Sequence, residues 1–327
     1  MTSGWWAGPV PRRSARTGPV PPGIRYRCPP VRRSTVSWRP GAQARPRSAA
    51  PVPGRLSSTT GGDRRGGPGV AVSDLFDVRG RRALVTGSSR GIGLALAVGL
   101  ARAGCAVVVH GRNRAAVDAA GAHVIAEAGP QARVSAVAFD VTDPSAVAAG
   151  VAEAEAAGGL DILVNNAGIQ HRESVLTVAP EVWDRVLATN LTGPFLLARA
   201  VAPGMVRRGT GKIVNVCSLM SEVARPGIAA YAAAKGGLKL LTRGLCAELG
   251  PHNIQVNGIG PGYIATELTA DLRADAEFDA WVRRRAPAGR WGTTDDLLGA
   301  LLFLVSAASD YVNGQIIYVD GGTLATI

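Results

Sequence analysis

From residue 81 to the C-terminus, short apolar runs alternate with longer alanine-rich segments. Seven of these runs are rich in valine, isoleucine and leucine and have the length of buried strands: residues 83–86, 106–109, 134–139, 162–164, 213–216, 254–256 and 316–319. The segments between them are helix-like, and strands that alternate with helices are typical of a parallel sheet. We therefore expect an α/β fold built on a doubly wound, seven-stranded parallel sheet.

A single domain over residues 73–327 accounts for this alternation, because no break in composition and no fixed repeat interrupts it. Residues 1–72 differ sharply, with thirteen arginines, one acidic residue and twelve of the 21 prolines. They carry the whole net charge of +12 and lack periodic apolar positions, so they cannot bury enough surface to fold. We expect a disordered Pro/Arg-rich extension. It is either a non-native product of translation upstream of the true start or an organelle-targeting segment.

Cysteine usage and hydropathy favour a cytoplasmic protein. Cys28, Cys105, Cys217 and Cys246 show no C-x-x-C spacing, and no apolar export segment follows the arginines near the N-terminus. The longest apolar stretch, residues 297–308, is shorter than the roughly 20 residues that cross a bilayer. The four histidines have no ligand spacing, so we expect neither a membrane span nor a metal site.

A glycine-rich turn follows the first predicted strand and opens a helix-like segment. It has the pattern Gly87-x-x-x-Gly91-x-Gly93, with Ser89, Arg90 and Ile92 between the glycines. Backbone amides at the start of a helix can bind a pyrophosphate. The glycines alone are weak evidence, because the 42 glycines of the chain predict about 0.7 chance matches. Their position between a strand and a helix indicates a dinucleotide site.

The end of the second predicted strand decides between the two nicotinamide cofactors. No carboxylate follows residues 107–109 where an NAD enzyme would bind the ribose hydroxyls, whereas Arg112 stands there. Together with Arg90 it could bind a 2′-phosphate through charge-assisted hydrogen bonds. We therefore expect NADP rather than NAD. Asp140 and Val141, at the end of the third strand, are the expected contacts for the adenine.

Tyr231 and Lys235 indicate the chemistry. Residues four apart share one face of a helix, so the Lys235 ammonium could lower the pKa of the Tyr231 phenol. A phenol with a lowered pKa can exchange a proton with a reacting oxygen. Ser218, thirteen residues upstream, could hydrogen-bond the same oxygen.

In this combination and order, these motifs resemble the short-chain dehydrogenase/reductase family over residues 75–327. About 0.05 Tyr-x-x-x-Lys pairs are expected by chance in a chain of this composition, so the ordered set is specific. The resemblance implies a Rossmann fold, a homo-oligomer and a proton relay in which Asn190 anchors a water. It also implies cofactor contacts from two further segments: Asn166, Ala167 and Gly168, and Pro261, Gly262, Ile264 and Thr266.

Four segments, residues 165–172, 217–222, 252–258 and 290–292, look especially like family members that act on sugar acids. The implied activity is NADP-dependent interconversion of D-gluconate and 5-keto-D-gluconate. Arg172, Glu222 and Arg225 are the candidates for the carboxylate and hydroxyls, beside Ser218 and Tyr231 at the reacting oxygen.

Two alternatives stay open at the level of sequence. The first is a short-chain reductase of another ketone, either a keto-sugar or a 3-oxoacyl thioester, since His171 and Leu219 depart from the residues expected in sugar-acid enzymes. The second is a nucleic-acid-binding protein that acts through its basic extension. We do not expect the second, because the catalytic set is complete and few aromatic residues interleave with the arginines.

Overall fold

The structure of the protein is a computed structural model that describes residues 71–326. These residues belong to one of two compact units, Arg65–Ile327. The predicted extension, apart from its last two residues, lies outside the described part. The short helix α1 (Val72–Leu75) begins one residue before the expected start of the domain.

A parallel sheet of seven strands organises the described unit, as the sequence predicts. Its spatial order is β3-β2-β1-β4-β5-β6-β7. The strands are β1 (Arg82–Val85), β2 (Ala106–Gly111), β3 (Val134–Ala138), β4 (Ile162–Asn165), β5 (Gly211–Val216), β6 (Ile254–Pro261) and β7 (Ile316–Val319). The chain reverses its direction of winding between β1 and β4, and ligands of such sheets bind at that point.

Strand β6 is longer than its sequence pattern predicts, because Gly258 and Gly260 interrupt the apolar run. Glycine is depleted in strands, where it offers no side chain to pack. Here a Cβ at Gly258 would collide with Ile316, and one at Gly260 would collide with the ring of Tyr318. The two glycines therefore let β7 pack closely beside β6 and extend the sheet by one strand.

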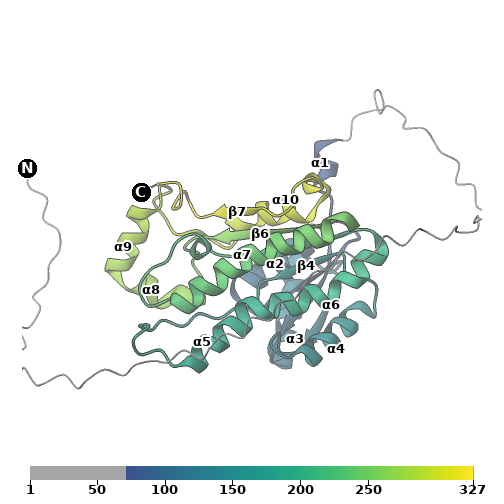
Figure 1. Cartoon of the computed structure of the whole chain (residues 1–327). Helices are drawn as coiled ribbons and strands as arrows, with labels where there is room; N and C mark the ends of the chain where they lie inside the picture. The colour runs from purple at the N-terminus through teal and green to yellow at the C-terminus, as the bar shows by residue number, and fades with distance from the viewer. Residues whose placement is uncertain (1–70, 327) are drawn as a thin grey trace, which may run out of the picture. The chain divides into compact units, whose positions relative to one another are not determined.

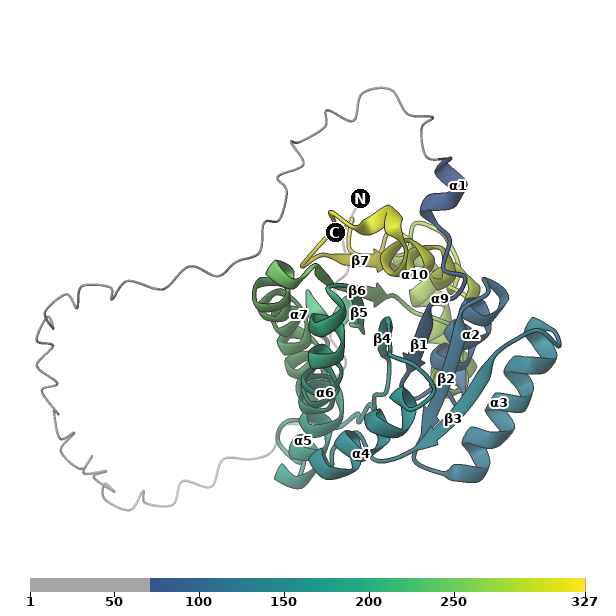
Figure 2. The same ribbon diagram turned by 90° about the vertical axis from the view of Figure 1, so that its right-hand side faces the viewer.

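Helices cover both faces of the sheet (Figures 1 and 2). The main ones are α2 (Gly91–Arg102), α3 (Arg114–Ala128), α4 (Pro144–Glu155), α5 (Pro180–Leu187), α6 (Gly193–Arg208), α7 (Ala229–Leu249) and α10 (Leu298–Val305). Val85 of β1 belongs to the buried cluster formed with α2, α3 and α10, whereas Leu84 belongs to the cluster formed with α4 and α6. Successive strand residues point to opposite faces, so each strand contributes to both cores.

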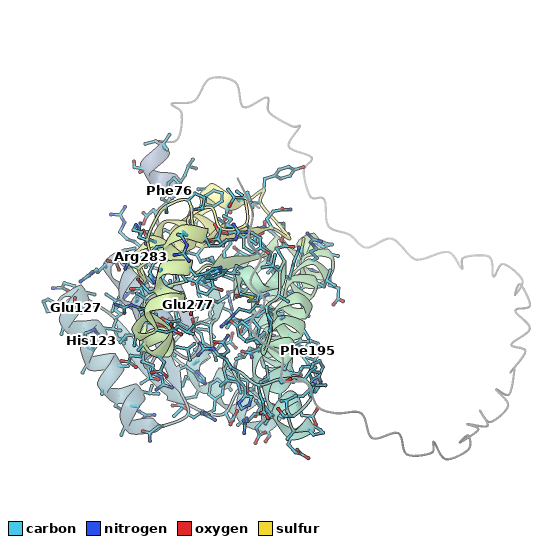
Figure 3. All side chains as sticks on the ribbon, turned by 90° about the vertical axis from the view of Figure 1, so that its left-hand side faces the viewer. Phe76, His123, Glu127, Phe195, Glu277 and Arg283 are labelled. Carbon is cyan, nitrogen blue, oxygen red and sulfur yellow. The ribbon has the colours of Figure 1, made fainter. Side chains whose placement is uncertain are left out.

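Two short helices, α8 (Ala270–Ala274) and α9 (Ala276–Arg285), lie between β6 and α10. The segment that carries them is closed by a bridge between Ile264 and Gly292. Figure 3 shows Glu277 and Arg283 on α9. Within residues 71–326, no helix combines the length and the apolar character needed to cross a membrane.

Candidate active site

A cavity of about 1160 Å³ opens at the carboxyl end of the sheet. Turns that follow the six strands β1 to β6 contribute to its wall, because the ends of parallel strands meet at one edge. Every predicted cofactor residue and every predicted catalytic residue lines this cavity. The sequence motifs, which are up to about 180 residues apart along the chain, therefore share one site.

The glycine turn needs glycine for steric reasons. Gly87 and Gly91 have φ angles of +63° and +57°, in the left-handed region that side chains disfavour. A Cβ at Gly93 would collide with the carbonyl of Gly87 and with the amide of Asn166. Nothing lies within 4 Å of a Cβ placed at Gly91, so this part of the turn is open. The backbone amides at the start of α2, whose residues line the cavity, suit a pyrophosphate.

Asn166 connects this turn to the end of β4. Its amide donates hydrogen bonds to the carbonyls of Thr86 (2.9 Å) and Gly87 (3.1 Å). The Thr86 hydroxyl in turn accepts from the backbone N–H groups of Asn166 (3.0 Å) and Ala167 (3.1 Å). The side chain of Asn166 therefore holds the walls of the cavity together.

His110, at the end of β2, is a functional position that the sequence analysis missed. Its Nδ1 accepts from the Gly87 N–H (3.1 Å), and its Nε2 lies 3.1 Å from the Phe139 carbonyl. These contacts require a neutral ring with the proton on Nε2. Burial lowers the pKa of His110 to about 4, which agrees with that form. A lone histidine at a strand end carries no sequence signal for such a role.

Two arginines and one aspartate lie at the end of the cavity that β2 and β3 form. Arg90 and Arg112 are exposed and line the cavity. Arg112 forms a loose ion pair with Asp140, at 3.9 Å. Asp140 accepts hydrogen bonds from the N–H and hydroxyl of Thr142, and these bonds lower its pKa. Positive charge therefore dominates where a 2′-phosphate would bind.

Ser218, Tyr231 and Lys235 come together at the inner part of the cavity. Ser218 follows β5, and Tyr231 and Lys235 lie one turn apart on α7. Lys235 is buried and donates a 2.6 Å hydrogen bond to the carbonyl of Val216, with its Nζ 5.7 Å from the centroid of the Tyr231 ring. The triad is thus positioned by one strand end and one helix face.

The spacing of Tyr231 and Lys235 predicts a lowered pKa for the Tyr231 phenol, but in the structure this pKa is raised. Burial raises the pKa of this phenol, and the hydrogen bond with Ser218 opposes the rise. Burial also lowers the pKa of Lys235 to about 8, because a low-dielectric environment disfavours the charged ammonium. Sequence spacing reports only which residues face each other. It does not report how deeply the fold buries them.

Asn190 lies in a π-helical segment, η1 (Ala188–Thr192), between α5 and α6. Such single turns often occur at functional sites. Its side chain accepts from the N–H of Ile169 (3.0 Å) and donates to the carbonyl of Ile169 (2.8 Å). Gly168 is required beside it, since a Cβ there would lie 2.6 Å from Asn190 Oδ1.

The three expected substrate residues differ in their position relative to the cavity. Arg225 lines the cavity, and its guanidinium lies 5.2 Å from the centroid of the Phe278 ring. Arg172 is exposed beside the cavity and donates to Gln170 (3.2 Å). Glu222 lies outside the cavity wall, where it accepts from the Tyr318 hydroxyl (2.6 Å) and pairs with Lys239. The geometry gives no support to Glu222 as a substrate contact.

The cavity wall also contains residues that were not among the predicted site residues. They include Gln170, His171, Tyr263, Asp271 and Leu272. His171 lies 2.8 Å from the carboxylate of Glu173. Within residues 71–326, no cluster of three or more histidine, cysteine, aspartate or glutamate side chains has the arrangement of a metal site.

The parallel sheet, the glycine turn and the Ser-Tyr-Lys set define a dehydrogenase of the short-chain class, and comparison with known proteins agrees. The profile of the family described as "Enoyl-(Acyl carrier protein) reductase" matches residues 87–323. The chain belongs to the short-chain dehydrogenase/reductase family and is an oxidoreductase.

Its relatives include several enzymes of sugar-acid metabolism. Gluconate 5-dehydrogenase of Gluconobacter oxydans (strain 621H) is 51% identical over 255 residues, which cover 78% of this chain and 98% of that protein. The 5-keto-D-gluconate 5-reductase of Escherichia coli (strain K12) is 45% identical over 259 residues, which cover 78% of this chain and 100% of that protein.

A solved structure shows the same architecture. The crystal structure of a gluconate 5-dehydrogenase from Burkholderia cenocepacia J2315 in complex with NADP and tartrate is 48% identical. Its TM-score is 0.75, and the match covers 78% of this chain and 99% of that one.

Proposed function

We propose that the protein interconverts D-gluconate and 5-keto-D-gluconate, with NADP as its cofactor. The observation that carries the proposal is the arrangement of the cavity: Ser218, Tyr231 and Lys235 lie at its inner part, and the Arg225 guanidinium lines it. The 45–51% identity to the gluconate and 5-ketogluconate enzymes supports the same substrate pair.

The cofactor end of the cavity fits NADP. The amides of the glycine turn would hold the pyrophosphate, with Arg90 and Arg112 at the 2′-phosphate. The remaining proposed contacts are Ser89, Ile92, Asp140, Val141, Asn166, Ala167, Gly168, Pro261, Gly262, Ile264 and Thr266. When bound, NADP in its oxidised form accepts a hydride and brings a positive charge.

In the oxidation direction, Tyr231 takes the proton of the substrate hydroxyl while Ser218 hydrogen-bonds the same oxygen. Because burial raises the pKa of this phenol above its ordinary value of about 10, moving it to near 7 requires more than about 4 kcal/mol of preferential stabilisation of the phenolate. Lys235 provides part of this stabilisation as a buried cation beside the ring. Asn190 would position the water through which Lys235 exchanges its proton with solvent.

Arg225 and Arg172 are the proposed cations for the substrate carboxylate, because both lie at the same end of the site and bind no carboxylate through a salt bridge within residues 71–326. A 3-oxoacyl chain would have little use for such a charge near the reacting carbon. The arginines therefore favour the sugar acid over an acyl thioester.

We also propose that residues 73–327 form the catalytic unit of a cytoplasmic homo-oligomer, as the family resemblance implies. Phe195 on α6 and Leu240 on α7 are exposed by 43% and 64%, and Figure 3 shows Phe195 at the surface. Exposed apolar side chains on neighbouring helices suit a contact between subunits.

NADPH formation with D-gluconate tests the function. We expect gluconate oxidation with NADP, and a loss of kcat/KM by a factor of about 10³ in Tyr231→Phe, because the proton acceptor is removed. Tyr311→Phe, which alters a fully exposed tyrosine, should keep full activity. If gluconate is inert while a keto-sugar or a 3-oxoacyl thioester is reduced, the family assignment stands and the substrate assignment is wrong.

A further inference from the structure

Two buried polar atoms, both on side chains of residues that line the cavity, have no hydrogen-bond partner among residues 71–326. They are Nε of Arg225 and the hydroxyl oxygen of Tyr263. Both residues line the cavity that holds Ser218 and Tyr231. A buried donor without a partner is costly, and where it recurs in a binding cavity it indicates the position of a ligand group.

Both side chains are held in place by aromatic packing. The Arg225 guanidinium lies over the ring of Phe278, at 5.2 Å from its centroid. The ring of Tyr263 makes edge contacts with Phe278, Trp281 and Trp291, at centroid distances of 5.6, 5.7 and 5.7 Å. Trp291 is itself fixed by a 2.7 Å hydrogen bond to Asp279. The two donors are therefore preorganised before any ligand binds.

Arg225 and Arg172 bring two positive charges to this part of the site, and Asp271 of the cavity wall brings a negative one. No salt bridge joins Arg225 or Arg172 to a carboxylate within the described residues. Burial lowers the pKa of Arg172 and Arg225 lowers it further, whereas Asp271 opposes the shift. A planar guanidinium and a hydroxyl, both free to donate, match the two oxygens of a carboxylate. A neutral hydroxyl of a polyol would leave the Arg225 guanidinium without a salt-bridge partner.

The reacting end of the site, at Tyr231, lies next to Tyr263. Tyr231 and Tyr263 both pack against the small apolar cluster of Leu219, Met220 and Ile228. A short sugar acid can therefore place one end at Tyr231 and the other at Tyr263. We propose that Arg225 Nε and the Tyr263 hydroxyl together bind the substrate carboxylate, and that this pair makes the enzyme select acids over neutral polyols. This inference rests on the proposed function.

Tyr263→Phe is the sharpest test, because it removes only the oxygen atom. We expect the KM for gluconate, and its dissociation constant from the NADP-loaded protein measured by calorimetry, to rise about tenfold. The value of kcat should stay within about twofold, and the melting temperature should stay equal or rise, since the lost hydroxyl has no partner in the protein. A purely structural role predicts the opposite pattern, with a lower melting temperature.

Arg225→Gln tests the charge. We expect about 100-fold weaker binding of gluconate but less than about threefold weaker binding of D-gluconamide, its neutral analogue. Tyr311→Phe and Arg207→Gln are matched controls at exposed positions away from the cavity and should behave as the wild type.

The outcomes separate the two proposals. If the wild-type protein neither binds nor oxidises gluconate, the proposed function is wrong and the carboxylate site with it. If the wild type oxidises gluconate while both variants keep its affinity and its preference over gluconamide, only the carboxylate site is wrong. A parallel loss of gluconate and gluconamide binding in Arg225→Gln would also contradict it.

Discussion

At the end of β2, the imidazole of His110 supports the cofactor turn from beneath. It accepts from the Gly87 N–H and packs against the ring of Phe139, with 4.1 Å between ring centroids. Its neighbour Ser88 adds reciprocal contacts, since His110 N–H donates to the Ser88 hydroxyl and Ser88 N–H donates to the His110 carbonyl. A single neutral side chain therefore couples the sheet to the phosphate-binding loop.

This arrangement predicts a loss of stability in acid. The pKa of His110 is about 4 in the folded protein and about 6.5 when unfolded, so the unfolded chain binds more protons between these values. The stabilisation is complete above pH 6.5 and is lost as the pH falls towards 4, by up to about 3 kcal/mol. Urea unfolding at a series of pH values measures it.

His110→Asn should flatten this acid dependence, because the amide oxygen can still accept from the Gly87 N–H but does not titrate in this range. His123→Asn, at an exposed position on α3 (Figure 3), is the control and should leave the pH dependence unchanged. If the free energy of unfolding falls with decreasing pH equally in the wild type and in His110→Asn, other groups cause the loss of stability in acid.

At the scale of the elements, the strand β1, the glycine turn and the helix α2 form one unit whose packing leaves no room for side chains. A Cβ at Gly87 would lie 2.8 Å from Ala167 Cα, and one at Gly93 would lie still closer to the Gly87 carbonyl oxygen, so either would collide with backbone. Helix α3 offers a contrast, since a Cβ at Gly121 would make ordinary contacts with Val109 (3.7 Å) and Val134 (3.8 Å).

The two helical glycines should therefore respond oppositely to alanine. Gly93→Ala is expected to destabilise the protein by about 2–4 kcal/mol and to abolish NADP binding, because backbone must move. Gly121→Ala should stabilise it by about 0.5–1 kcal/mol, since alanine favours a helix and the space exists. Thermal unfolding with and without NADP measures both. Equal effects would contradict the steric account of the turn.

At the scale of the whole chain, the net positive charge and the residues of the active site lie in different segments. Residues 1–72 carry the net charge of +12, whereas the motifs of the active site all lie between residues 87 and 266. The family profile likewise matches only residues 87–323. The proposed catalytic unit contains the whole cavity, so its activity should not depend on the basic segment.

Removal of residues 1–70 tests this separation. We expect kcat and KM for gluconate to change by less than about twofold. Any binding of DNA at low salt should disappear with the arginines, because phosphate contacts supply such affinity. Steady-state kinetics and a salt titration of DNA binding, compared between the two chains, measure these effects. A tenfold loss of kcat/KM would show that the extension takes part in the active site.

The sequence by itself determined the seven strands and their helices, because the alternation of apolar runs with alanine-rich segments is local information. It also located the residues of the glycine turn and the Ser-Tyr-Lys set, whose motifs depend on short spacings. The oxidoreductase class follows from these residues, and the family membership confirms it.

Only the tertiary structure decided which of the candidate substrate residues reach the cavity. Arg225 lines it, whereas Lys239 on α7 and Tyr318 on the distant strand β7 hold Glu222 outside it. The roles of His110 and Tyr263 likewise depend on contacts between residues far apart in sequence. Burial and hydrogen bonding, which also govern the pKa of Tyr231, arise from packing between elements, and no local pattern of residues specifies them.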